Sequence, residues 1–194
     1  MAFDEIVSDY IREHRDDARA EMRFFEIQRS PSEGIWKAAL CELPSRKRHP
    51  HQRRIPKTAL EQAEACLQTI GRKLAKAGDF AALYGLVVGE VGNIKGIGAL
   101  TSYDIAHRIG ALFGKAPRLV YLHAGTRTGA RVVNISGDSF DPRILPKAFS
   151  RLAPSEIEDC LCIYKDELRD GAHSRTARHK SRCAVAVRQR CAWE

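Results

Sequence analysis

The stretch that decides the fold reads Ile94-Lys-Gly-Ile-Gly-Ala-Leu-Thr-Ser-Tyr-Asp-Ile-Ala-His-Arg-Ile109, and an apolar helical pattern over residues 80–91 precedes it. Two glycines flank one apolar residue, which predicts a tight turn because glycine adopts positive φ freely and carries no Cβ. Such a turn exposes backbone N–H groups, and the helix that follows directs its positive end to the same place. Ile94 and Ile97 are expected to anchor the turn in the core, which leaves Lys95 to meet an anion.

Helical periodicity extends over most of the chain on both sides of this turn. Apolar residues recur at spacings of three and four over residues 58–78. Helices are also expected over residues 2–28, 32–43, 141–152 and 155–168, and only residues 118–122 suggest an extended segment. The expected fold is therefore all-α, with a helical domain over residues 1–170 that forms either one body or two lobes with a cleft.

Capping residues set several of the expected helix starts. Ser32 and Asp79 each precede an apolar helical pattern, so their side-chain oxygens are expected to accept hydrogen bonds from the first helical amides. Ser155 and Glu158 have the spacing of a capping box at the start of the last helix.

Basic residues are in excess and unevenly distributed. The 194 residues include 32 Lys and Arg against 24 Asp and Glu, a net charge of +8. The acids crowd residues 4–26 and 156–170, whereas the segment 45–57 holds six bases and no acid. This segment is interpreted either as a solvated linker or as a loop that contacts phosphates. The tail 171–194 is expected to be disordered and to add salt-sensitive affinity for an anionic partner.

Several classes of protein are disfavoured by the composition. No apolar run approaches the roughly 20 residues that a membrane span needs, and acids stand near the N-terminus where a signal peptide would carry bases. The six cysteines form no C-x-x-C pair, which argues against disulfides and zinc. We therefore expect a cytoplasmic protein with no membrane contact, no metal and no cofactor.

Apolar-x-Gly-apolar-Gly followed by a helix resembles the helix-hairpin-helix motif of DNA-repair proteins, here over residues 94–114. The resemblance implies that hairpin amides bind the backbone of duplex DNA without reading its sequence. A plain glycine-rich connection between two helices is the competing interpretation. The expected nucleic-acid contacts are Arg53, Arg54, Lys95, Gly96, Ile97, Gly98, Thr101, Arg127 and Arg131.

The chain more distantly resembles the helix-hairpin-helix DNA glycosylases. In that superfamily the hairpin is followed by one helix, a short apolar segment and a catalytic aspartate, and residues 113–131 share this rhythm. However, Leu122 or His123 stands where the aspartate is expected, and Leu100 stands where bifunctional members carry a nucleophilic lysine. An enzyme of this kind would be a monofunctional glycosylase-type hydrolase.

Cleavage of an N-glycosidic bond needs a carboxylate and an acid or hydrogen-bond donor. Asp104 or Asp159 is the expected carboxylate and His123 the expected donor, with Tyr121 or Tyr164 stacking on an everted base. Asp104 is equally consistent with an acid that the helix dipole favours in the first turn.

Four segments, residues 47–54, 97–104, 121–127 and 158–166, also resemble a bacterial family of hypothetical proteins, which implies no activity. Three hypotheses remain. The chain is a DNA-binding protein that contacts the duplex backbone, in repair or defence; or a glycosylase-like enzyme that acts on a damaged or modified base; or a protein-interaction domain that binds no nucleic acid.

Overall fold

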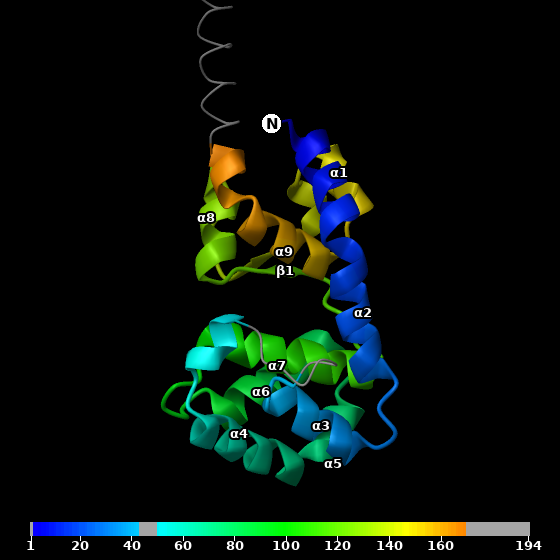
Figure 1. The fold of residues 1–194 in the computed structure, drawn as a ribbon, viewed down its shortest axis with the longest axis vertical. Helices are drawn as coiled ribbons and strands as arrows, with labels where there is room; N and C mark the ends of the chain where they lie inside the picture. The colour runs from blue at the N-terminus through cyan, green and yellow to red at the C-terminus, as the bar shows by residue number, and fades with distance from the viewer. Residues whose placement is uncertain (1, 43–49, 170–194) are drawn as a thin grey trace, which may run out of the picture. The chain divides into compact units, whose positions relative to one another are not determined.

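The computed structural model describes residues 2–42 and 50–169 (Figure 1). The fold is all-α, as the periodicity predicts, with a single small sheet in the described part. In chain order the elements are α1 (Phe3–Glu13), α2 (Arg15–Glu26), α3 (Pro31–Ala39), the 3-10 helix η1 (Pro50–Arg54), α4 (Lys57–Thr69), α5 (Gly71–Lys76), α6 (Phe80–Val91), α7 (Ala99–Leu112), β1 (Val120–Tyr121), α8 (Ala124–Val132), β2 (Ser139–Phe140), the 3-10 helices η2 (Pro142–Ile144) and η3 (Lys147–Arg151), and α9 (Pro154–Ile163). Residues 45–49 of the basic segment and the tail 171–194 lie outside the described residues. In the described ranges, no helix has both the length and the apolar character that crossing a membrane requires.

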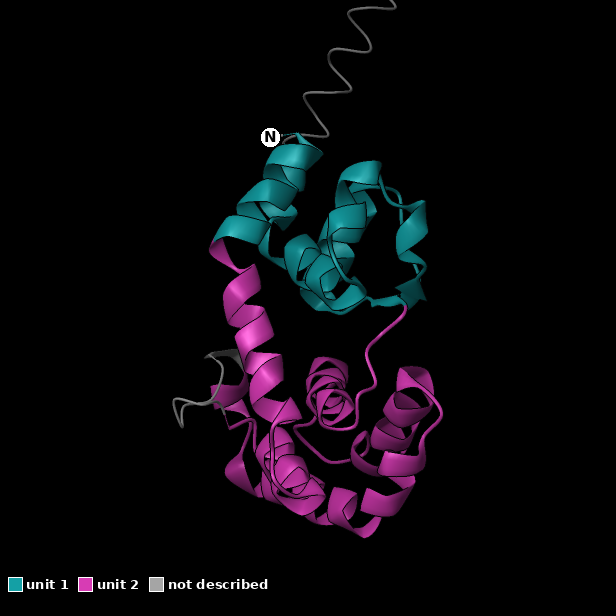
Figure 2. Cartoon of the chain, turned by 90° about the vertical axis from the view of Figure 1, so that its right-hand side faces the viewer, with its two compact units in different colours: residues 1–12, 119–194 teal, residues 13–118 magenta. Residues whose placement is uncertain are grey.

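The chain divides into two compact units (Figure 2). Unit 1 consists of residues 1–12 and 119–194, and unit 2 of residues 13–118. Unit 2 is thus one continuous piece of chain, whereas unit 1 is assembled from the two ends of the sequence.

Unit 2 is built around α6 and α7, the two helices that the hairpin joins. The expected stripe of α6 is buried, with Phe80, Leu83, Val87 and Val91 facing the core. Helices α3 and α4 complete this core, and Gly34 of α3 lets the α3 backbone approach α7 closely. A Cβ on Gly34 would lie 2.6 Å from a methyl carbon of Leu112.

In unit 1, helix α9 contacts α8 and the strand β1, and α1 contacts α9 and η3. Ile6, Val7 and Tyr10 of α1 are fully buried in this core. Strands β1 and β2 pair antiparallel with Val120 opposite Phe140, so the extended segment expected over residues 118–122 is confirmed.

Glycines allow α8 and α9 of unit 1 to pack with their backbones close together. A Cβ on Gly129 would lie 2.1 Å from the carbonyl oxygen of Leu161, and one on Gly125 would lie 2.4 Å from the Sγ atom of Cys162. Gly129 is therefore required for this approach, because its neighbour is backbone, whereas a side chain at position 125 would displace only the Cys162 thiol.

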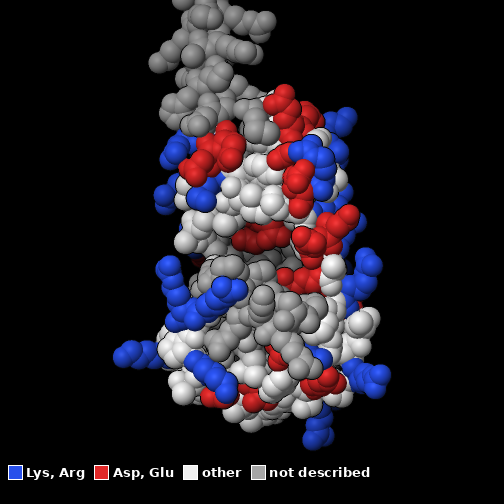
Figure 3. Space-filling view, in the orientation of Figure 1, with Lys and Arg blue, Asp and Glu red and all other residues white. Residues whose placement is uncertain are grey.

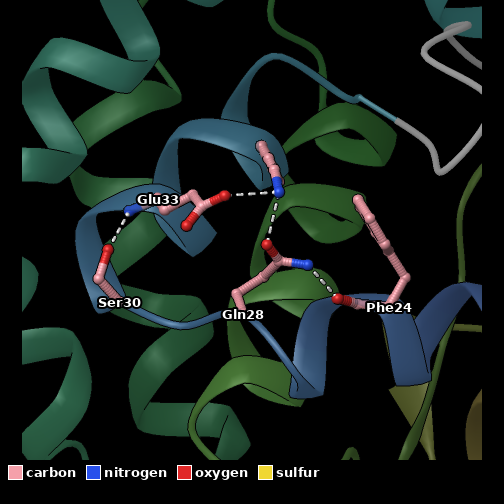
Figure 4. A network of polar contacts seen from close by, with 5 residues as sticks. Phe24, Gln28, Ser30 and Glu33 are labelled. Atoms are coloured by element: carbon pink, nitrogen blue, oxygen red, sulfur yellow. Dashed lines mark hydrogen bonds and ion pairs between the residues drawn. The ribbon is translucent and has the colours of Figure 1, made fainter.

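The predicted caps are partly right. The Asp79 carboxylate accepts a hydrogen bond from the Ala82 N–H at 2.9 Å, as expected. Ser32 does not cap α3, because Pro31 already occupies the first helical position and Ser30 takes the cap. The Ser30 Oγ atom accepts from the Glu33 N–H at 3.2 Å (Figure 4).

The predicted capping box of Ser155 and Glu158 is wrong. Helix α9 begins two residues earlier than that box requires, with Pro154 at its first position. The Glu156 carboxylate accepts a hydrogen bond from the Ala153 N–H at 2.9 Å. Glu156, and not Glu158, therefore accepts the hydrogen bond at the start of α9.

Four expected helices are interrupted or absent in the structure, and one of them is the helix over residues 155–168, which is interrupted at Tyr164. The helix expected over residues 2–28 is interrupted at His14, close to the boundary between the two units, and the one over 58–78 is interrupted at Ile70. The helix expected over residues 141–152 is wrong, since η2 and η3 lie there. Pro146 lacks the N–H that a continuous helix needs at this point.

Candidate nucleic-acid interface

The hairpin of unit 2 is a tight turn between α6 and α7. The Ile97 N–H donates to the Ile94 carbonyl at 2.9 Å, and Gly96 adopts a φ of +100°. Gly98 then takes an extended conformation directly before α7. Ile94 and Ile97 are buried, so their predicted role as anchors is confirmed, and Lys95 between them is exposed.

Backbone amides at the start of α7 face no internal partner. The first hydrogen bond of the helix runs from the Ser102 N–H to the Gly98 carbonyl at 2.9 Å. Within the described residues, the N–H groups of Ala99, Leu100 and Thr101 donate to no protein atom. A Cβ placed on Gly98 would meet nothing within 4 Å, so there is open space beside these amides. The Thr101 side chain is itself buried.

The described end of the basic segment lies against the hairpin. A Cβ on Gly96 would lie 3.4 Å from the Cδ atom of Pro56. Arg53 and Arg54, just before Pro56, are both exposed. Figure 3 shows Lys and Arg side chains on the side of unit 2 where η1 and the hairpin are drawn in Figure 1.

A buried polar network joins this segment to α7. Gln52 is fully buried, its Nε2 donates to the Asp104 carboxylate at 2.7 Å, and its Oε1 accepts from the Arg108 guanidinium at 3.3 Å. The Arg108 Nε donates to the Glu21 carboxylate at 3.1 Å, and its guanidinium lies over the Phe25 ring. Asp104, one of the predicted catalytic residues, therefore accepts a hydrogen bond within unit 2.

His107 lies beside this network on α7. Its ring stacks on that of Tyr103, with the centroids 5.7 Å apart. Burial lowers the pKa of the His107 imidazole to about 4; the charge of Asp104 opposes this shift and that of Arg108 adds to it. The imidazole is therefore neutral near pH 7.

The other predicted catalytic and stacking residues belong to unit 1. His123 is buried directly before α8, and Asp159 accepts a hydrogen bond from the Tyr10 hydroxyl at 3.2 Å. Burial, followed by the charge of Asp159, raises the pKa of Tyr10 above its usual range. Tyr164 is buried and donates to the Asp9 carboxylate at 2.7 Å, while Tyr121 is half-buried in β1.

The predicted residues thus fall into both units. Asp104 belongs to unit 2, whereas His123 and Asp159 belong to unit 1. Of the two arginines predicted beyond the hairpin, Arg127 forms an ion pair with Asp138 at 2.6 Å and Arg131 is exposed. Both arginines lie on α8, which belongs to unit 1, whereas the hairpin belongs to unit 2.

Comparison with known proteins supplies no relative. No protein-family model, curated protein or solved structure matches this chain. In the described ranges, no three His, Cys, Asp or Glu side chains gather closely enough to hold a metal ion. Function is therefore inferred from the residues themselves.

Sequence reasoning missed two buried polar residues, Gln52 and Arg108, and gave a third, Glu158, the wrong structural role. Gln52 and Arg108 were not singled out, although Asp104 and Arg108 stand four apart on α7 and so share a helix face. Glu158 is buried and accepts from the Thr126 hydroxyl at 2.5 Å. The glycine spacing of residues 125 and 129 is the signal that would have placed α8 against α9 and so brought this pair together.

Proposed function

We propose that this chain binds duplex DNA through the sugar-phosphate backbone, with the hairpin of residues 94–101 as the central contact. The observation that carries the proposal is the set of three unpartnered amides at Ala99, Leu100 and Thr101, beside the open space at Gly98. Such amides at a helix N-terminus bind a phosphate oxygen, because their N–H groups and the helix dipole both favour negative charge.

Exposed cations surround this position and strengthen the proposal. Lys95 lies within the hairpin. Arg53 and Arg54 come shortly before Pro56, which lies against Gly96 of the hairpin. Each cation that neutralises a phosphate releases counterions, which makes binding tighter and dependent on salt. Contacts of this kind position a protein on the duplex and do not read its sequence.

We propose binding alone and not hydrolysis. Both carboxylates predicted for catalysis are engaged within their own units, Asp104 with Gln52 and Asp159 with Tyr10. Each carboxylate thus has a partner in its own unit, which accounts for its position without a catalytic role.

The test is the affinity of the full chain for a labelled duplex, measured by fluorescence anisotropy between about 50 and 200 mM salt. We expect affinity to fall steeply as salt rises, and Lys95→Glu to weaken binding about tenfold on every sequence tested, since it replaces a phosphate contact by a repelling charge.

The matched control is Lys76→Glu, which makes the same change in net charge elsewhere in unit 2. Lys76 is exposed at the end of α5. The start of α4 lies against Gly96 of the hairpin, and α5 follows the other end of this 13-residue helix, which is about 20 Å long. The affinity of the Lys76→Glu variant for DNA should fall by less than about threefold, because a charge this far from the hairpin is screened by salt. Equal losses in the two variants, or an affinity unchanged across the salt range, would contradict the proposal.

A further inference from the structure

Gln52 links the basic segment to α7, the helix that begins directly after the hairpin. Its side chain is fully buried, and both ends of its amide are used, one on Asp104 and one on Arg108. These partners lie 52 and 56 residues further along the chain, on one face of α7. The amide is therefore held in one orientation.

The partners of Gln52 are themselves fixed. The Arg108 side chain is only 3% exposed, and its bond to Glu21 ties it to α2. The Phe25 ring lies beneath the guanidinium, with its centroid 5.7 Å away. Gln52 and Arg108 are buried, and their hydrogen bonds to each other and to the partly exposed Asp104 and Glu21 make the network resist movement more than a surface ion pair would.

The short segment from Gln52 to Pro56 is thus held at two points. Gln52 is held on the flank of α7, and Pro56 lies against Gly96 of the hairpin. The Ile55 N–H also donates to the Gln52 carbonyl at 3.1 Å, which closes the turn between these points. Arg53 and Arg54 stand on this fixed turn with their side chains exposed.

We infer that Gln52 is a positioning residue for DNA binding. Together with Asp104 and Arg108, Gln52 holds Arg53 and Arg54 beside the hairpin. The two arginines and the hairpin amides can then bind neighbouring phosphates, and the segment from Gln52 to Pro56 does not have to become ordered first. Ordering a mobile segment on binding lowers affinity, and a pre-ordered one avoids this cost. The inference rests on the proposed function, and it gives Asp104 the role of a hydrogen-bond acceptor for Gln52.

The first experiment uses Gln52→Leu, which keeps an apolar stem of similar size and removes both hydrogen bonds. We expect DNA affinity to fall about tenfold at about 0.1 M salt, with the log–log salt slope shallower by about two, as if two phosphate contacts were lost. Without DNA, trypsin should cleave after Arg54 at least several-fold faster than in the wild type. The control, Gln62→Leu, makes the same chemical change at an exposed position of α4 and should alter neither readout.

A double-mutant cycle then separates positioning from a general loss of structure. If Gln52 acts through the arginines, Gln52→Leu should weaken binding little further in a chain that already carries Arg53→Ala and Arg54→Ala. Asp104→Asn should keep nearly full affinity, because the new amide oxygen still accepts from Gln52, whereas Asp104→Leu should behave like Gln52→Leu. Should Gln52→Leu fail to fold, Gln52→Asn, too short to reach both partners, replaces it with the same expectation.

Two results would overturn the inference while leaving the proposed function intact. One is a Gln52→Leu variant that binds DNA as tightly as the wild type. The other is a loss of affinity that adds fully to that of the two arginine substitutions. A wild-type chain with no salt-dependent binding would overturn the proposed function as well.

Discussion

His107 shows how strongly the interior of unit 2 opposes a second positive charge. Its ring stacks on Tyr103 and lies beside the buried guanidinium of Arg108, whose charge disfavours protonation of the imidazole. Burial contributes the larger part of the pKa shift to about 4. The network around Gln52 thus carries one buried cation, and its neighbour stays neutral over most of the pH range in which proteins are stable.

This shift predicts how the stability of the protein depends on pH. An unfolded histidine takes up its proton near pH 6.5, and His107 resists protonation in the fold until about pH 4. The unfolded state therefore binds more protons between these values, so the free energy of unfolding falls as pH drops through this window, by about 1–3 kcal/mol in total. Urea unfolding at several pH values measures this loss.

His107→Gln should flatten the decline, because glutamine takes up no proton in either state. An equally steep decline in the His107→Gln variant would mean that other groups cause it.

At single residues, the sequence predicted the local roles and missed the long-range ones. The burial of Ile94 and Ile97 and the cap of Asp79 follow from their immediate neighbours, and these predictions are confirmed. The partnership of Gln52 with Asp104 joins residues 52 apart, and no local spacing encodes it. The carboxylate of Asp104 makes it a candidate from the sequence, but its partner Gln52 lies within the basic segment 45–57, where nothing marks it as buried.

Among the elements, periodicity predicted which residues are buried better than where helices end. The apolar spacing of residues 58–78 continues across Ile70, so nothing in the pattern marks the break between α4 and α5. The stretch from 141 to 152 carries a helical pattern but also prolines at 142 and 146, and the loss of backbone donors outweighed the pattern. Proline positions therefore deserved more weight than apolar spacing in this segment.

Helix α8 offers a sharp test of how closely α8 and α9 pack. Gly129→Ala should lower the free energy of unfolding by at least about 1–3 kcal/mol, since the added Cβ would lie 2.1 Å from the Leu161 carbonyl oxygen. The control is Gly85→Ala on α6, where a Cβ meets nothing within 4 Å. That variant should gain about 0.5–1 kcal/mol, because alanine favours a helix more than glycine does.

Both glycine variants can be measured by urea unfolding followed by circular dichroism. If Gly129→Ala proved as stable as the wild type, the close approach of α8 to α9 would be wrong, and with it the burial of the Thr126–Glu158 pair between them.

On the scale of the whole molecule, the two units differ in how the chain builds them. Unit 2 is continuous from residue 13 to 118 and contains the hairpin, the described part of the basic segment and the Gln52 network. Unit 1 depends on α1 at one end of the sequence, because Ile6, Val7 and Tyr10 fill a core that is otherwise made by residues after 119. Every residue that the proposed DNA contact uses therefore belongs to one continuous unit.

This arrangement predicts different behaviour for two fragments. Residues 13–118 expressed alone should give a helical circular dichroism spectrum and unfold cooperatively, because about 100 residues is the usual size of an independent domain. Their affinity for duplex DNA should be within a few-fold of that of residues 1–170, which also lack the basic tail. Residues 119–169 alone should not fold cooperatively, because they lack the buried face of α1 and the Tyr10 hydroxyl that bonds Asp159. A fragment 13–118 that folds but does not bind DNA would place the interface outside unit 2, and the hairpin would then be a structural connection between α6 and α7.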